Sequence, residues 1–301
     1  LKLKATDIPH DKILIIDKEA ELGLHSSGRN SGVLHAGLYY KPGSLKAKVC
    51  TEGARRLKIW IRERNLTISQ CGKLIIPTRL EQDDQLEVLA EQGISNGAKV
   101  EIWNKERLKN FIPEAQSASG RVIWSPSTAV VKPVSIIRRL KADLIEKGVQ
   151  FLQNQNGLLV RTETRQIKVG DGSKISYGHL INCAGLQADR LAHIFEVGMN
   201  YHLLPFKGYY WKIKECCPIK IKINLYPVPD LELPFLGVHF TPSADKLPVV
   251  SIGPTATPAW GRENYRHLQG IEPIMAAKNL MLLTRQYVAN KGKIRQYVHG
   301  Q

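Results

Sequence analysis

The sequence of 301 residues contains no long apolar run. Its longest apolar stretches, such as residues 13–16 and 280–283, are far shorter than the roughly 20 residues that a membrane-spanning helix needs. The opening residues also lack the apolar centre and the small-residue cleavage site of a secretory signal peptide. These absences predict a cytoplasmic protein, mitochondrial if its source is eukaryotic.

The five cysteines lack the spacing of a metal site or of a redox pair. None forms a C-x-x-C pair or groups with histidine, so the common zinc motifs are excluded and we expect no metal. An odd number of cysteines in a chain of this length is typical of a reducing compartment, where buried thiols behave as small apolar side chains.

Acidic residues are too few to balance the basic ones. The chain has 27 Asp and Glu against 43 Lys and Arg, for a formal net charge of +16. Such an excess occurs in proteins that bind nucleic acid, anionic lipid or anionic substrates. The basic residues are spread along the chain without a recognisable nucleic-acid motif, so we expect no nucleic-acid partner. A diffuse positive field favours a carboxylate substrate and peripheral contact with the inner face of a membrane.

The order of the predicted elements indicates a nucleotide-binding α/β domain interleaved with an antiparallel β-rich domain. Residues 12–17 form an apolar run closed by an acid, which is typical of a buried parallel strand. Residues 170–172 (GDG) predict a hairpin turn. From residue 203 to 252 the pattern is mostly β, and from residue 271 to the end it is helical. Further strands are predicted at residues 74–76, 100–103, 149–152, 158–162, 166–169 and 180–183, and further helices begin near residues 44, 81, 104, 133 and 189.

Asp17 has the position of a ribose-binding acid in a dinucleotide-binding fold. Such an acid follows a Gly-rich phosphate loop by about 20 residues, but no G-x-G-x-x-G occurs in the sequence. We therefore expect the first strand and its glycine loop to lie before residue 1. Taken alone, this segment is better explained as a plain core strand.

Residues 25–47 (HSSGRNSGVLHAGLYYKPGSLKA) form a long loop of unusual chemical density. Its glycines allow the backbone to pass close to a flat ligand, and its short polar side chains can form hydrogen bonds. Long loops in compact domains are more often functional than plain linkers. The residues that point to ligand binding are Ser26, Ser27, Gly28, Arg29, Asn30, Ser31, Gly32 and His35.

This loop resembles the flavin-contacting loop of the L-2-hydroxyglutarate oxidases and dehydrogenases, in the FAD-dependent D-amino-acid-oxidase-like superfamily. Each further motif is moderately specific, and their order makes the resemblance strong over the chain up to about Tyr265. The further motifs are QCGKL (70–74), NCAGLQADR (182–190), PFKGYY (205–210), YPVPD (226–230) and PFLGVH (234–239).

The resemblance implies an incomplete Rossmann-like FAD-binding domain interleaved with an antiparallel β-rich substrate domain. We expect the FAD domain at residues 1–70 and 133–202, and the substrate domain at residues 71–132 and 203–262. Residues 263–301 would form a helical segment that leads to a C-terminal part beyond this chain, so that pieces of the family's enzyme are missing at both ends.

The implied reaction is the oxidation of L-2-hydroxyglutarate to 2-oxoglutarate. The C2 hydrogen leaves as hydride to flavin N5, a base takes the hydroxyl proton, and the electrons pass to oxygen or a quinone. Histidine suits the base because its ordinary pKa is near the working pH. His35 and His239 are the candidates, although His35 could equally shape the flavin loop and His239 could be a half-buried strand residue.

The resemblance also implies the ligand contacts. Asp17 would bind the adenosine ribose, residues 26–31 would run beside the flavin, and a later strand would bring Ala184 and Gly185 to the cofactor. A dicarboxylate needs cations or several donors to hold it. The candidates for binding it are Arg29, Lys207, Tyr209 and Tyr226.

Three alternatives stay open. The chain could be another flavin oxidase of the superfamily that acts on glycerol 3-phosphate or an amine. It could be a non-catalytic fragment that holds no FAD, which the missing phosphate loop favours. A nucleic-acid binder is the third alternative, and it would bind duplex DNA with a steep salt dependence.

Overall fold

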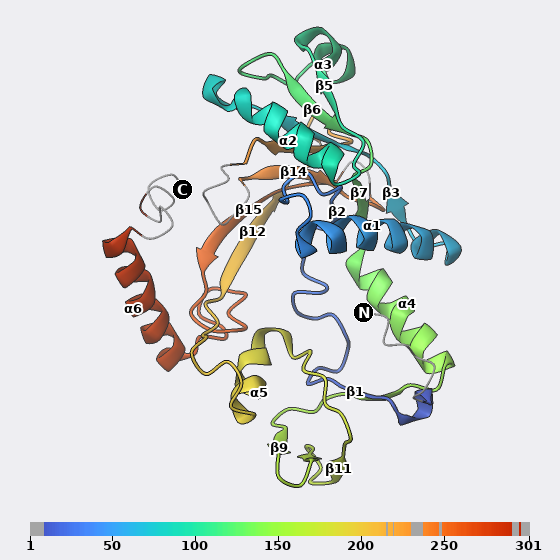
Figure 1. Cartoon of the computed structure of the whole chain (residues 1–301), viewed down its shortest axis with the longest axis vertical. Helices are drawn as coiled ribbons and strands as arrows, with labels where there is room; N and C mark the ends of the chain where they lie inside the picture. Colours follow the sequence, from blue (N-terminus) through green and yellow to red (C-terminus); the bar gives the residue numbers. More distant parts are fainter. Residues whose placement is uncertain are drawn as a thin grey trace. The chain divides into compact units, whose positions relative to one another are not determined.

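The computed structural model describes residues 9–214, 216–218, 220–229, 237–246, 249–290 and 295. The chain divides into two compact units, coloured by sequence in Figure 1. Unit 1 comprises residues 1–30 and 133–205, and unit 2 comprises residues 31–132 and 206–301. The predicted division into an FAD domain and a substrate domain stays a prediction. It differs from the compact units mainly in residues 31–70, which belong to unit 2.

Unit 1 contains a parallel pair of short strands and a small antiparallel sheet. Pro133 begins α4, and the helix leads into the parallel pair. The predicted hairpin turn at residues 170–172 is confirmed, and Gly172 adopts a φ of +86° there. The elements of unit 1 are η1 (His10–Lys12), β1 (Leu14–Ile16), α4 (Pro133–Glu146), β8 (Gln150–Leu152), β9 (Leu159–Arg161), β10 (Gln166–Lys168), β11 (Lys174–Ser176), η3 (Gly185–Gln187) and α5 (Ala188–Ile194).

The strand predicted at residues 180–183 is wrong, because the described backbone there has no ladder partner. Strand β1 pairs with β8, and the antiparallel sheet contains β9, β10 and β11. A strand needs a neighbour to satisfy its backbone groups, so an apolar pattern without a neighbour stays irregular.

Unit 2 is built on a seven-stranded mixed sheet in the order β12-β15-β14-β13-β4-β6-β5. Neighbouring strands run antiparallel except β13 and β4, which are parallel. The strands are β4 (Lys73–Ile76), β5 (Glu101–Trp103), β6 (Val122–Ser125), β12 (Phe206–Lys212), β13 (Asn224–Pro227), β14 (His239–Pro242) and β15 (Val250–Pro258).

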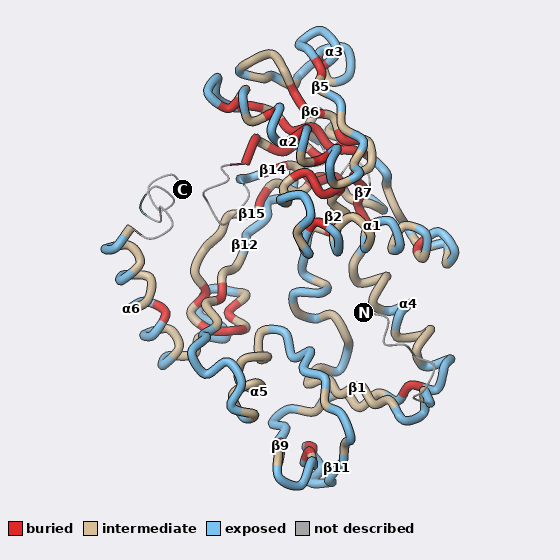
Figure 2. The backbone as a smooth tube through the Cα atoms, viewed as in Figure 1, coloured by how far each residue is buried: buried red, intermediate tan, exposed pale blue. Residues whose placement is uncertain are grey.

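The two faces of this sheet bury different side chains because successive residues of a strand point to opposite sides. On one face Ile75 and Ile123 pack against Leu86 and Leu89 of α2 (Asp84–Ser95). The opposite face of β4 and β6 has its own apolar cluster, which includes Leu108 of α3 (Lys105–Phe111). Figure 2 shows the buried residues of unit 2 concentrated around α2, β6 and β14.

Two helices of unit 2 begin where the sequence predicts. Ser44 caps α1 (Leu45–Glu63), since its Oγ accepts a hydrogen bond from the Ala47 N–H at 3.2 Å. Asn104 caps α3 in the same way through the Arg107 N–H. The other elements are β2 (Val33–Leu34), β3 (Ile68–Ser69), η2 (Leu80–Gln82), β7 (Ala129–Val131) and α6 (Pro273–Ala289).

Some predicted features lie outside the described residues. These are residue 230 of the YPVPD motif, residues 234–236 of the PFLGVH motif, and residues 291–294 and 296–301 of the predicted helical tail. Among the described residues, no helix combines the length and the apolarity that crossing a bilayer requires.

Candidate functional site

Five side chains of unit 2 form a buried group that we call the Lys73 cluster. It consists of His35, Tyr39, Lys73, Tyr226 and His239. Lys73, Tyr226 and His239 come from the adjacent strands β4, β13 and β14, and the other two come from the loop that follows β2.

The sheet register explains how the three strand residues meet. Lys73 is paired with Asn224, and Tyr226 lies two residues further along β13 on the same face. His239 lies across from Tyr226 in the antiparallel β13–β14 pair, and the two rings stack with centroids 3.9 Å apart. The strands therefore place a cation, a phenol and an imidazole side by side.

A turn at Gly37 brings the loop residues to the same place. Gly37 has a φ of +96°, a conformation that favours glycine. A Cβ atom there would lie 2.7 Å from Cγ2 of Thr51, so the loop also needs glycine for space. The Asn96 side chain donates to the carbonyls of Gly37 and Tyr40 at 2.9 and 2.8 Å and holds the turn.

Lys73 lies at the centre of the cluster. Its Nζ is 3.1 Å from the Tyr39 hydroxyl and 3.4 Å from Nδ1 of His35. The same ammonium lies over the rings of Tyr39 and Tyr226, at 4.3 and 4.9 Å from their centroids. Within the described residues, no carboxylate pairs with Lys73, although the side chain is 0% exposed. A buried cation without a counter-ion is costly, which makes Lys73 an unusual feature of this core.

Burial keeps the cluster close to neutral. It lowers the pKa of Lys73 to about 7, because removal from water disfavours the charged form. Burial, followed by the positive charge of Lys73, lowers the pKa of His35 to about 3. The pKa of His239 is also lowered by burial. Burial raises the pKa values of Tyr39 and Tyr226, so both phenols keep their protons.

The two predicted catalytic histidines are therefore brought into one cluster. The His35 ring meets the Tyr226 ring edge to face, with 6.0 Å between their centroids. The His239 ring stacks on the same Tyr226 ring. His239 is 4% exposed and its Nδ1 lies 2.9 Å from the Gly237 carbonyl. Their catalytic roles stay a prediction.

The predicted substrate residues are distributed unevenly. Tyr226 belongs to the cluster. Lys207 donates to Oδ1 of Asn264 at 2.8 Å and lies over the Tyr209 ring at 5.5 Å, so the two share a face as their alternation predicts. The β12–β15 register is irregular between Tyr209 and Trp211. The residue in between, Tyr210, is close enough to Tyr226 to raise the pKa of that phenol.

The predicted cofactor residues of unit 1 form a polar loop with exposed donors. Asp17 follows β1, and its Oδ1 accepts the Glu19 N–H at 2.8 Å. The side-chain amide of Asn30 donates to the carbonyls of Ser26 and Ser27, whose hydroxyls make no hydrogen bond within the described residues.

Backbone geometry constrains the rest of this loop. A Cβ atom on Gly28 would lie 2.0 Å from the Gly23 carbonyl oxygen, so the turn requires glycine. Arg29 lies in the same unit, and its Nε donates to the Leu24 carbonyl at 2.5 Å. Ser31 and Gly32 belong to unit 2, where the Ser31 hydroxyl accepts the Val33 N–H.

Ala184 and Gly185 lead into η3 of unit 1. The Ala184 N–H donates to Oδ1 of Asn182 at 3.2 Å, and Gly185 adopts a φ of +54°. The Asp17 carboxylate, which follows a parallel strand, suits the ribose of a dinucleotide. The exposed hydroxyls of Ser26 and Ser27 suit a polar edge of the flavin ring. The donor set of unit 1 therefore fits FAD.

Sequence reasoning missed Lys73 and Tyr39 as site residues. Both lie in motifs that carry the family resemblance, but neither received a role. The sequence did contain a signal for Lys73, which stands at the start of the apolar strand KLII. Lysine is almost never fully buried without a partner, so a lysine in such a strand indicates a functional residue.

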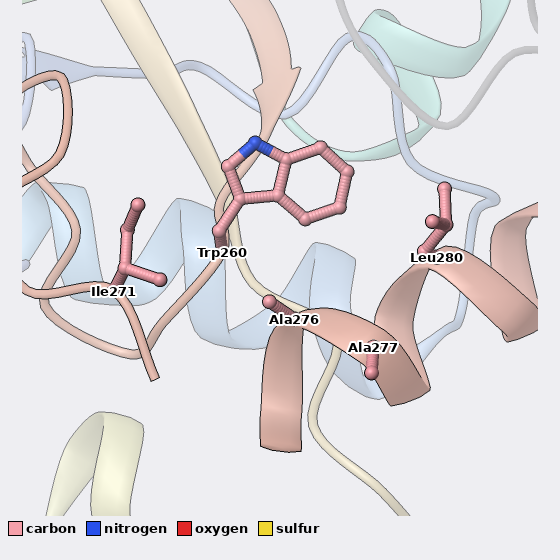
Figure 3. Close-up of a pocket in the computed structure, with 5 residues that line it drawn as sticks. All are labelled: Trp260, Ile271, Ala276, Ala277 and Leu280. Carbon is pink, nitrogen blue, oxygen red and sulfur yellow. The ribbon is translucent and has the colours of Figure 1, made fainter. Parts of the chain in front are cut away.

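A separate apolar pocket of about 300 Å³ lies in unit 2 beside α6. In Figure 3 the indole of Trp260 lies beside Ala276 and Leu280 of that helix. The pocket shares no lining residue with the Lys73 cluster and offers no titratable group.

Comparison with known proteins identifies the class of this chain. The family model described as FAD dependent oxidoreductase (DAO) matches residues 2–296, so the chain belongs to that family. The resemblance and the α/β fold class predicted from the sequence are confirmed.

The relatives are more specific. The chain is 38% identical over 278 residues to the L-2-hydroxyglutarate dehydrogenase of Indibacter alkaliphilus, covering 89% of this chain and 67% of that protein. It is 35% identical over 273 residues to the mitochondrial L-2-hydroxyglutarate dehydrogenase of Homo sapiens, covering 86% and 58%. The chain thus spans about three fifths to two thirds of the length of these curated relatives.

Solved structures share the fold at low identity. The FAD-bound L-alpha-glycerophosphate oxidase of Mycoplasma pneumoniae matches with a TM-score of 0.71 and 21% identity, over 89% of this chain and 72% of that one. The glycine oxidase of Geobacillus kaustophilus matches with a TM-score of 0.66 and 17% identity, over 93% and 73%.

Proposed function

We propose that this chain is part of an FAD-dependent enzyme that oxidises L-2-hydroxyglutarate to 2-oxoglutarate. The observation that carries the proposal is the Lys73 cluster, a buried group of neutral imidazoles and a cation, in a chain 38% identical to an L-2-hydroxyglutarate dehydrogenase. Bound FAD would supply the acceptor for the hydride that leaves C2 of the substrate.

The residues of unit 1 would hold the cofactor. The Asp17 carboxylate would accept hydrogen bonds from the adenosine ribose, since its second oxygen has no partner within the described residues. The exposed hydroxyls of Ser26 and Ser27, with the loop through Gly28 and Asn30, would contact polar edges of the cofactor. Ala184 and Gly185 complete the set of unit 1, and Ser31 and Gly32 of unit 2 are further candidates for contacts with the cofactor.

The residues of unit 2 would manage the proton. An alcohol loses its hydroxyl proton as its C2 hydrogen leaves, so a base must be unprotonated at the working pH. The lowered pKa values of His35 and His239 meet that condition near neutrality. A neutral imidazole in a water-poor site can then accept the proton.

The substrate carboxylates would need donors. Lys207 and the Tyr209 hydroxyl share one face of β12, and Tyr226 adds a buried phenol. Arg29 is the remaining candidate, and its Nε is already engaged by the Leu24 carbonyl. Charge-assisted bonds from such groups suit a dicarboxylate better than a neutral amine.

The test is a visible absorbance spectrum of the purified chain after incubation with excess FAD and removal of unbound cofactor. We expect retained flavin bands that bleach without air when L-2-hydroxyglutarate is added. Glycerol 3-phosphate and glycine, added separately, are the matched substrates for the related oxidases. If only glycerol 3-phosphate or only glycine bleaches the flavin, that compound is the substrate and L-2-hydroxyglutarate is not. If the chain retains no flavin absorbance, the proposal is wrong for this chain.

The electron acceptor and the membrane are a finer part of the proposal. We infer that the reduced enzyme passes electrons to oxygen or a quinone, and that its net charge of +16 favours peripheral contact with anionic lipid. Re-oxidation by a soluble quinone analogue, compared with air, distinguishes the acceptors. Co-sedimentation with anionic vesicles tests the membrane contact, and we expect 0.5 M salt to reverse it. Sedimentation that persists in this salt, or no sedimentation in its absence, would contradict an electrostatic contact at the surface.

A further inference from the structure

The two histidines of the Lys73 cluster differ in the partner of their Nδ1 atom. Nδ1 of His239 lies 2.9 Å from the Gly237 carbonyl oxygen. Nδ1 of His35 lies 3.4 Å from the Lys73 ammonium. A carbonyl oxygen only accepts hydrogen bonds and an ammonium only donates them, so the two partners demand opposite tautomers.

For His239 the partner requires a proton on Nδ1. A neutral imidazole carries one N–H, so a proton on Nδ1 leaves the lone pair on Nε2. The ring is also fixed in orientation by its stacking on Tyr226, with 15° between the two planes. His239 therefore presents an acceptor at Nε2.

For His35 the partner requires a lone pair on Nδ1. The proton then lies on Nε2, and His35 presents a donor there. Edge contacts with the rings of Tyr39 and Tyr226 at 6.1 and 6.0 Å hold this imidazole in place. The two histidines thus offer an acceptor and a donor within one cluster.

We propose that Lys73 is a positioning residue that holds His35 as the Nε2–H tautomer, which makes His239 the base and His35 a hydrogen-bond donor. This inference rests on the proposed function for the roles at the substrate. The substrate hydroxyl proton passes to Nε2 of His239, and the Nε2–H of His35 donates to the same substrate oxygen as the O–H bond breaks. Bound FAD would accept the hydride that leaves C2, so the substrate would lose one proton and one hydride, and charge and electrons balance.

The surroundings of Lys73 suit this task. A carboxylate partner would neutralise the ammonium and compete for its protons, but none pairs with Lys73 within the described residues. The Tyr39 hydroxyl oxygen accepts a second hydrogen bond from the Lys73 ammonium, with an N···O distance of 3.1 Å, and orients the group. Burial of the unpaired Lys73 ammonium destabilises the fold. A residue that lowers stability in this way is better explained by a functional role than by a structural one.

The assignment predicts a pH dependence. Burial lowers the pKa of Lys73 to about 7, so the obligatory donor is present below that pH and is lost above it. A neutral amine can accept from Nδ1–H, so we expect the Nε2–H population of His35 to fall between about pH 7 and 9. The titratable groups that face Lys73 are His35, Tyr39, Cys50, Tyr226 and His239.

The first test is a side-chain nitrogen–proton correlation spectrum of the chain labelled with ¹⁵N-histidine, at pH 6. We expect the Nε2–H tautomer at His35 and the Nδ1–H tautomer at His239, with signals assigned by the His35→Gln and His239→Gln variants. The reverse tautomer at either ring in the unsubstituted chain would overturn the assignment, and this readout does not depend on FAD or turnover.

The second test removes the donor. Lys73→Met should abolish the preference of His35 for Nε2–H and leave His239 unchanged. Lys58→Met is the matched control, since Lys58 is a half-buried lysine of α1 that donates to the Ser127 carbonyl outside the cluster. An unchanged His35 tautomer in a folded Lys73→Met variant would overturn the role of Lys73. If that variant does not fold, the spectrum of the unsubstituted chain still decides.

The third test concerns turnover in the FAD-loaded full-length enzyme. Lys73→Met should lower kcat about 10- to 100-fold with little change in KM, and Lys73→Arg should recover part of it. The loss should be smaller than the roughly 10²- to 10⁴-fold of a lost general acid or base, because Lys73 acts only through His35. Equal loss in Lys58→Met would assign the effect to structure and overturn the positioning role. A protein with the expected tautomers but no oxidation of L-2-hydroxyglutarate would refute the proposed function and leave the tautomer assignment intact.

Discussion

The two units of the chain differ in how much of their structure is buried. In unit 2 the side chains of Leu74, Ile75 and Ile123 are all 0% exposed. In unit 1 the helix α4 has no buried residue along its whole length, and β1 pairs with a single neighbour. Unit 2 therefore stabilises its candidate site through its own core. The candidate cofactor residues of unit 1 lie on a thinner framework, which we expect bound FAD to stabilise.

The two units also differ in the chemistry proposed for them, proton transfer in unit 2 and cofactor binding in unit 1. The proposed proton chemistry lies among buried neutral groups, where burial shifts the pKa values. The proposed cofactor contacts are the exposed hydroxyls of Ser26 and Ser27 and the Asp17 carboxylate, whose second oxygen has no partner within the described residues. Substitutions in the two units should therefore affect different measurements.

The largest expected effect is on catalysis by unit 2. His239→Gln in the FAD-loaded full-length enzyme should lower kcat for L-2-hydroxyglutarate by about 10²- to 10⁴-fold, the range of a lost general base. Retention of the flavin spectrum is the control for an intact unit 1. A kcat within threefold of the unsubstituted enzyme would place the base elsewhere.

The next effect is on the stability of unit 2 and its pH dependence. The pKa of Lys73 is about 7 when folded and near 10.5 when exposed, so the unfolded state binds more protons between these values and stability rises with pH there. Lys73→Met should remove this rise and stabilise unit 2 at pH 6.5 by on the order of 4 kcal/mol. Hydrogen exchange of β4 amides at pH 6.5 and 9 measures the difference, and a slope that persists in the variant would contradict the assignment.

A smaller effect is expected on stability when one core side chain is truncated in each unit. Ile123→Ala should destabilise unit 2 by about 2–4 kcal/mol, because Ile123 is fully buried and its removal leaves a cavity. Ile137→Ala in α4, where the side chain is half-buried against Gly23, should destabilise unit 1 by about 1 kcal/mol. Hydrogen exchange resolved by unit measures both. Equal losses would remove the contrast between the units.

The smallest effect concerns the cofactor. Asp17→Asn keeps the size of the side chain but weakens its acceptor, so the dissociation constant for FAD should rise about 10-fold. Flavin fluorescence quenching measures the affinity, and the kcat at saturating FAD should not change. A lower kcat without weaker binding would move Asp17 from the cofactor site to the chemistry.

Much of the local structure could be predicted because it depends on short-range rules. Ser44 and Asn104 cap their helices through side-chain oxygens that reach the next turn. The turn at residues 170–172 depends on glycine at a positive φ. The strand expected at residues 180–183 failed because an apolar pattern does not reveal whether a neighbouring strand exists.

The site could be predicted only in part. The motifs around His35 and His239 pointed to both residues. The register of β13 and β14 brings His239 to Tyr226, and the turn at Gly37 brings His35 to the same phenol. Tyr210 could not be told from Tyr209, because the irregular β12–β15 register decides which of them approaches Tyr226.

The sequence by itself determined the family, the motif order, the helix caps and the candidate histidines, since these depend on residue identity and short spacing. Only the tertiary structure decided that Lys73 meets His35 across 38 residues and that His239 stacks on Tyr226 of the neighbouring strand. Burial and hydrogen-bond partners arise from segments distant in sequence, and they set the protonation states on which the chemistry depends.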